Sequence, residues 1–174
     1  LGDSGSVADF GFDSLTEDDL QLIKEADYVC VFNWNLNLCG TELAGKVFEL
    51  VKKVGKGKTF FDTGDPSPRQ GEINDLIEKV LIARTIDVVS LNENEALWYA
   101  SYFDKSISKK RKSMPPAYLA IECARILHDN LRTRIDLHTA DYTATFSQEE
   151  CIVQTFGVPI KRVTGAGDAW NAAD

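Results

Sequence analysis

The sequence predicts an α/β protein in which helices and strands alternate around a mostly parallel sheet. Patterns of both kinds follow one another through most of the chain, as expected for stacked βα units. A length of 174 residues suits one domain with a substantial hydrophobic core. The composition, 44% hydrophobic and 26% charged, is typical of globular proteins and excludes fibrous and disordered classes.

The first two βα units are predicted from capping and from apolar spacing. A helix is expected over 16–26, because Thr16 can cap it and three acidic residues follow in its first turn. An apolar run predicts a buried strand over 28–32. The segment 43–54 carries an apolar residue every three or four positions, which predicts a helix, and the strand 58–62 follows it.

The same alternation continues through the middle of the chain. Apolar residues in 73–81 follow the i, i+3, i+4, i+7, i+8 spacing of a helix that lies on a sheet. The next strand is expected over 86–91, and Asn92 then opens another helix. The polar and basic stretch 104–116 is typical of a surface loop. Apolar residues at helical spacing follow in 120–127 and predict another helix.

The last third of the chain is predicted to add a short strand over 134–138 and a β-hairpin formed by 143–146 and 151–155. We find no repeat of fixed period and no linker composition, so we expect a single domain over residues 1–174. The chain begins at Leu1 and ends as a helical pattern starts, so we expect either a fragment or a sequence joined across internal gaps.

Charge and composition narrow the function classes. With 19 basic and 27 acidic residues the net charge is −8, so nucleic acid is not an expected partner. No apolar run approaches the roughly 20 residues of a membrane span, and the start lacks a signal peptide, so we expect a cytoplasmic protein without membrane contact. The four cysteines and two histidines share no metal-site spacing and indicate neither zinc nor disulfides.

The segment 163–170 is the strongest candidate for chemistry. Gly165 and Gly167 on either side of Ala166 allow a tight turn into a helix, whose free N–H groups could form an anion hole. Asp168 would lie in the first helical turn, beside the bound anion, where it could accept a proton from an attacking hydroxyl. The alternative is an ordinary helix start with an acidic capping residue.

A second candidate is the pair Asn92 and Glu95 at a strand-to-helix junction. The two residues are one helical turn apart on the same face, so their amide and carboxylate could hold the water shell of one Mg²⁺ ion. The other interpretation is a capping box, with Asn92 as the N-cap and Glu95 as its partner. The two roles are compatible with each other.

Three motifs, in this order along the chain, resemble those of the ribokinase-like (PfkB) carbohydrate kinase family. The run 61–69 is similar to a family strand followed by Asp-Pro-Asn-x-Arg, and 92–95 resembles its Asn-x-x-Glu. The third is Gly-Ala-Gly-Asp at 165–168, which resembles the family signature near the end of a βα chain. The resemblance spans about residues 7–174.

This resemblance implies a ribokinase-like α/β/α sandwich with a mostly parallel central sheet and a site at the carboxyl ends of the strands. The implied reaction is transfer of a nucleotide γ-phosphoryl group to a hydroxyl of a sugar, nucleoside or similar small molecule. The implied site residues are the base Asp168, the anion hole Gly165, Ala166 and Gly167, the magnesium pair Asn92 and Glu95, and the weaker candidates Asp65 and Arg69.

The same resemblance implies Mg²⁺ as cofactor and ATP as co-substrate, and it leaves open a monovalent cation and a homodimer. It also implies that an N-terminal acceptor and lid segment and C-terminal helices are missing from the chain.

Departures from the family signature at Arg162 and Val163 support an alternative, a non-catalytic nucleotide- or sugar-binding relative, and Ser67 also departs from the family motif matched by 61–69. An open path from Asp168 to a pocket would favour the kinase, because a base must reach its substrate.

Overall fold

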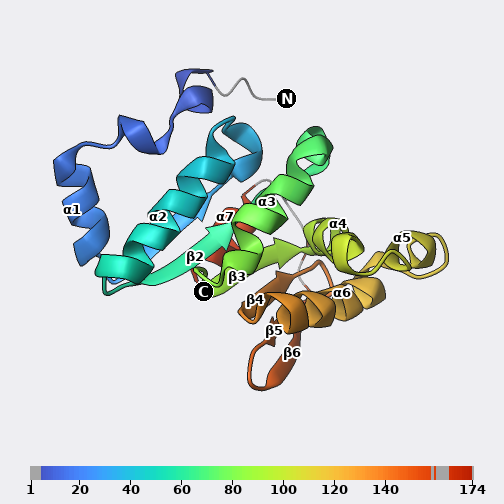
Figure 1. Cartoon of the computed structure of the whole chain (residues 1–174). Coiled ribbons are helices and arrows are strands. Elements are labelled where there is room, and N and C mark those ends of the chain that lie inside the picture. Colours follow the sequence, from blue (N-terminus) through green and yellow to red (C-terminus); the bar gives the residue numbers. More distant parts are fainter. Residues whose placement is uncertain (1–4, 158, 160–164, 174) are drawn as a thin grey trace.

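A computed structural model describes residues 5–157, 159 and 165–173 of the chain (Figure 1). The strands form one six-stranded sheet in the order β1-β2-β3-β4-β5-β6. Neighbours from β1 to β4 are parallel, and the β4–β5 and β5–β6 pairs are antiparallel. The strands are β1 (Tyr28–Phe32), β2 (Lys58–Asp62), β3 (Val88–Asn92), β4 (Arg134–His138), β5 (Tyr142–Phe146) and β6 (Glu150–Gln154).

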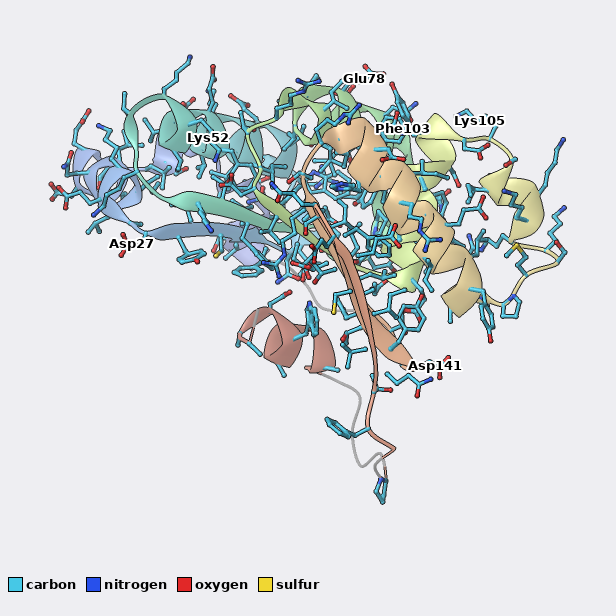
Figure 2. The ribbon with its side chains drawn as sticks, turned by 90° about the horizontal axis from the view of Figure 1, so that it is seen from below. Asp27, Lys52, Glu78, Phe103, Lys105 and Asp141 are labelled. Atoms are coloured by element: carbon cyan, nitrogen blue, oxygen red, sulfur yellow. The ribbon has the colours of Figure 1, made fainter. Side chains whose placement is uncertain are left out.

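The helices lie mainly on one face of this sheet. Because β1 to β4 follow one another in space in chain order, right-handed crossovers put the helices between them on the same side. Figure 2 shows α7 on the opposite face from α2, α3 and α6. The helices are α1 (Glu17–Glu25), α2 (Gly40–Val54), α3 (Ile73–Lys79), α4 (Glu93–Phe103), α5 (Ile107–Lys110), α6 (Pro116–Leu131) and α7 (Ala166–Asn171).

Local sequence signals account for several helix boundaries. The Thr16 hydroxyl accepts a hydrogen bond from the Asp19 N–H at 3.2 Å, and the Asp19 carboxylate accepts from the Thr16 N–H at 2.8 Å, so α1 starts with a capping box. Gly55 follows the end of α2, as its sequence pattern predicts. The stretch 104–116, predicted as a loop, instead contains α5, because Ile107 is fully buried and anchors one helical turn.

The hydrophobic core lies between the sheet and the helices α2, α3, α4 and α6. Phe48 of α2 and Phe61 of β2 are both fully buried and meet edge to face, with ring centroids 5.5 Å apart. Leu76 and Ile77 of α3 are also fully buried. This packing fixes the parallel strands, and with them the ends of β2 and β3 where the candidate site lies. No helix in the described part of the chain is long and apolar enough to cross a membrane.

Candidate functional site

The carboxyl ends of β2 and β3 bring polar side chains to one edge of the sheet. β2 ends at Asp62 and β3 at Asn92, and Asp62 pairs in register with Ser90. Asp62 Oδ1 accepts a hydrogen bond from the Gly64 N–H at 2.8 Å. Gly64 has φ +64, in the left-handed region that favours glycine, so the chain turns sharply away after the strand. This turn leaves the Asp62 carboxylate at the sheet edge.

The structure brings Asn92 and Glu95 together as a reciprocal capping box at the start of α4. Asn92 Oδ1 accepts from the N–H groups of Asn94 and Glu95, at 2.9 and 3.0 Å. Glu95 Oε2 accepts from the Asn92 N–H at 2.8 Å, and Oε1 accepts from the Asn92 side-chain amide at 2.7 Å. Each carboxylate oxygen still has a lone pair, so capping and binding of a water shell remain compatible.

Burial makes Glu95 the most perturbed carboxyl group of this edge. The residue is only 3% exposed. Its burial, with smaller contributions from the charges of Asp62, Asp65 and Glu93, outweighs the Asn92 N–H and raises the pKa of Glu95 to about 8. The group is therefore largely neutral at neutral pH, and a cation nearby would favour its ionised form.

The two weaker candidates lie in different surroundings. Asp65 Oδ1 accepts from the Ser67 N–H at 3.0 Å and from the Asn94 amide at 3.1 Å, which holds Asp65 beside the start of α4. Arg69 is turned into the fold instead. Its guanidinium donates to the Trp34 carbonyl at 2.7 Å and to Glu72 at 2.8 Å, and lies 4.3 Å from the centroid of the Trp34 ring. Arg69 thus ties the loop that holds the buried Trp34 to the segment after β2.

The helix α7 is docked over the carboxyl ends of the strands. Its last residue, Asn171, donates from its amide to Asp62 Oδ2 and accepts from the Ser90 hydroxyl at 2.9 Å. Trp170 stacks on His138 at the end of β4, with centroids 5.7 Å apart. Burial lowers the pKa of His138, although the nearby charges of Asp62 and Glu93 raise it, so the neutral form of the stacked imidazole is favoured.

Asp168 and the glycines lie at the open end of this arrangement. Gly165 has φ +88, and Ala166 begins α7 directly after it. Asp168 is exposed and, with Phe32, Asn171 and neighbouring residues, lines a hollow of about 340 Å³. Asp168 therefore has the access to solvent that a base needs. A Cβ atom added at Gly167 would lie 3.8 Å from His138 Cε1, an ordinary van der Waals contact. Arg162, Val163 and Thr164 lie outside the described residues.

The residues at this edge of the sheet suit a Mg²⁺ ion that keeps its water ligands better than one bound directly by protein groups. Among the described residues, no group of three histidine, cysteine or acidic side chains converges on one metal position. Carboxylate and amide oxygens from Asp62, Asp65, Asn92 and Glu95 nevertheless border the same edge of the sheet. Mg²⁺ prefers oxygen ligands and keeps several of its waters, so this donor set suits an ion held through water.

Sequence reasoning missed the residues that join the two parts of the site. Ser90 and Asn171 carry no motif, and the Asn171 amide reaches Asp62 across 109 positions of the chain. Such a contact depends on tertiary structure alone. Asp62 and His138 could have been found by one signal, since each ends a predicted parallel strand and strand carboxyl ends commonly form binding sites in α/β folds.

The chain has the ribokinase-like fold, as the solved structures similar to it show. Adenosine kinase from Anopheles gambiae, solved with a diadenosine tetraphosphate, aligns with 92% of the chain at a TM-score of 0.59 and 15% identity. A putative ribokinase II from Escherichia coli aligns with 89% at 0.60 and 16% identity. A phosphofructokinase from Pyrococcus horikoshii with bound AMP aligns with 75% at 0.57 and 15% identity.

The chain spans 46% of the length of the first two of these proteins and 32% of the third. No protein-family model matches the sequence, and no curated protein matches it significantly. The similarity at these identities establishes the fold class predicted from the sequence, an α/β protein of the ribokinase type with a mostly parallel sheet.

Proposed function

We propose that this chain carries the phosphoryl-transfer part of a Mg²⁺-dependent kinase, which transfers the γ-phosphoryl of ATP to a hydroxyl of a sugar, nucleoside or similar small molecule. One observation carries the proposal. The amide of Asn171 bonds to Asp62 and Ser90, which joins the helix of Asp168 to the sheet edge of Asn92 and Glu95. A base and a magnesium site must share such an edge for in-line transfer.

In this proposal each group of site residues has a separate role in the reaction. Asp168 accepts the proton of the acceptor hydroxyl as that oxygen attacks the γ-phosphorus, and it is exposed, as this role requires. The backbone N–H groups around Gly165, Ala166 and Gly167 stabilise charge that develops on the transferred group. Asn92 and Glu95, with Asp62 and Asp65 close by, hold the waters of Mg²⁺. When bound, the ion neutralises charge on the nucleotide phosphates.

The names of the similar structures support a sugar, nucleoside or similar small molecule as the acceptor. They include an adenosine kinase, a ribokinase and a phosphofructokinase, and two of those structures contain adenine nucleotides. These names describe kinases of sugars and nucleosides. Since the chain spans less than half of each, the acceptor and the activity of the whole protein belong to the proposal.

A screen of acceptors tests this function directly. The full-length protein is incubated with Mg-ATP and a panel of sugars and nucleosides, and ADP release is followed by a coupled assay. We expect turnover with at least one hydroxyl compound and none when Mg²⁺ is removed by a chelator. Nucleotide binding without turnover on any acceptor, in a folded sample, would refute the kinase.

The second candidate is a non-catalytic nucleotide- or sugar-binding relative, and the environment of Glu95 favours it. Both oxygens of this buried carboxyl are already bonded to Asn92, which is sufficient for a purely structural cap. In that case nucleotide affinity would not depend on Mg²⁺. A titration of nucleotide with and without Mg²⁺ therefore separates the two candidates.

A further inference from the structure

A basic hollow lies at the opposite edge of the sheet from the candidate site. It has a volume of about 480 Å³ and lies where the chain enters β3 and β4, before Val88 and Arg134. The charged and titratable residues that line it are Lys52, Arg84, Asp87, His128, Arg132 and Arg134. Lys52, labelled in Figure 2, comes from the last turn of α2. Arg84 and Asp87 precede β3, His128 lies in the last turn of α6, Arg132 follows that helix, and Arg134 begins β4.

Two of these cations have no acidic partner in the described part of the chain. Lys52 bonds to both oxygens of Asp87 at 2.6 to 2.7 Å, and Arg134 pairs with Asp136 at 2.8 Å. Arg84 and Arg132 are exposed, and no described residue forms an ion pair or a side-chain hydrogen bond with either. The single acid of the hollow is thus already neutralised, which leaves two free guanidinium groups in a chain of net charge −8.

The backbone at both arginines takes a conformation that arginine disfavours. Arg84 follows the 3-10 helix Leu81–Ala83 with φ 58 and ψ 31, and Arg132 follows α6 with φ 58 and ψ 37. Glycine is the common residue at such left-handed helix ends because it has no Cβ. Two equivalent positions before adjacent strands therefore both carry a strained arginine beside the same hollow. Strain of this kind points to a role for the side chains.

Two hydrogen bonds join the segments that form the floor of the hollow. The Thr133 hydroxyl donates to the Ile86 carbonyl at 2.7 Å and joins the segments that enter β3 and β4. His128 Nδ1 lies 2.7 Å from the Thr133 carbonyl, so this nitrogen carries the proton and donates it, and the ring is fixed on the same wall. A hydrogen-bonded polar floor beside the exposed guanidinium groups of Arg84 and Arg132 is suited to hold a compact ligand.

We propose that this hollow binds a small multivalent anion of the phosphate type, such as pyrophosphate or a phosphate ester, outside the phosphoryl-transfer site. Guanidinium groups match phosphate oxygens in pairs of parallel hydrogen bonds, which favours two arginines for such a ligand. The volume is that of a small-molecule site. We do not expect a long polyanion to bind here, because the rest of the chain has a net negative charge and would repel it.

The test uses pyrophosphate without Mg²⁺, followed by calorimetry and by amide NMR of the protein. We expect binding in the wild type, with amide shifts at Thr133 and Arg134 and none at Asp168. In an Arg84→Gly/Arg132→Gly variant the affinity should fall about tenfold or more, since charged hydrogen bonds are lost. Its melting temperature without ligand should not fall, because glycine accepts the left-handed backbone.

The matched control is Arg111→Gln/Lys112→Gln, which removes two exposed charges that have no ion pair among the described residues. This control should bind pyrophosphate as the wild type does. An equal loss of affinity in the control would show general charge attraction and would overturn the proposal. Amide shifts confined to α7, or no binding by the wild type at millimolar pyrophosphate, would overturn it as well. The wild-type shift map decides the question even if the glycine variant does not fold.

Discussion

Replacing the buried carboxyl of Glu95 with an amide should change how the stability of the fold depends on pH. The pKa of Glu95 is raised from 4.5 to about 8, mainly by burial. The native state therefore keeps this proton to higher pH than the unfolded chain, so stability is lost as the pH rises from about 4.5 toward 8. The slope approaches 1.4 kcal/mol per pH unit, so the wild type should lose about 2 to 3 kcal/mol between about pH 5 and 7 relative to Glu95→Gln.

Urea unfolding curves at several pH values measure this difference. The amide also disturbs the capping box, since one of its two oxygen acceptors is lost, but that cost does not depend on pH. Contributions of groups far from Glu95 are the same in both proteins and cancel in the comparison. The matched control is Glu93→Gln in the same helical turn, which should keep a slope close to that of the wild type. Parallel stability curves for the wild type and Glu95→Gln would refute the raised pKa and the argument from burial.

Repeating the urea unfolding of both proteins in the presence of Mg²⁺ gives a second test of Glu95. If the ionised Glu95 carboxylate holds the water shell of Mg²⁺, the ion should restore stability to the wild type near pH 7. The Glu95→Gln variant should respond less. Equal stabilisation of both proteins by Mg²⁺ would leave Glu95 with the capping role alone.

Three further substitutions test how the edge of the sheet is built. Arg69→Met should cost about 2 to 4 kcal/mol in urea unfolding, because the carbonyls of Trp34, Asn37 and Leu38 lose a charged donor and Glu72 loses its partner; a cost below about 1 kcal/mol would contradict this. Gly64→Ala should lower the melting temperature, since φ is +64 and the new Cβ would lie 2.5 Å from Asn35 Oδ1; an unchanged melt would refute the close packing. Asn171→Ala should increase amide hydrogen exchange in α7 while the sheet stays protected, and unchanged exchange would show that other contacts dock this helix.

Elements whose signals are local could be predicted from the sequence with their bounds. The bounds of the strands Tyr28–Phe32, Lys58–Asp62 and Arg134–His138 are confirmed residue for residue, because each is a short run directly after a clear helix or turn signal. The burial predicted for 28–32 is wrong, because β1 is an edge strand of which only Val29 is buried. The strand expected over 86–91 instead covers Val88–Asn92. Its apolar run begins before the sheet does, and Ile86 is buried ahead of the first strand residue.

The candidate site could be predicted only where its parts are close in sequence. Spacing alone identified the contact between Asn92 and Glu95, and the structure confirms that contact. The contacts of Asn171 with Asp62 and Ser90 could not be predicted, because they join distant segments through tertiary packing. The roles of these residues in binding and catalysis stay predictions.

The turnover of an Asp168→Asn variant tests the central claim most directly. Asparagine keeps the shape of the side chain and most of its capping ability, so stability should change by no more than about 1 kcal/mol. It cannot accept the proton, and loss of a positioned base typically lowers the rate by about 10²- to 10⁴-fold. We predict a collapsed turnover number with the best acceptor, intact nucleotide binding and a nearly unchanged melt. Turnover close to that of the wild type would show that Asp168 is not the base and would contradict the proposed mechanism.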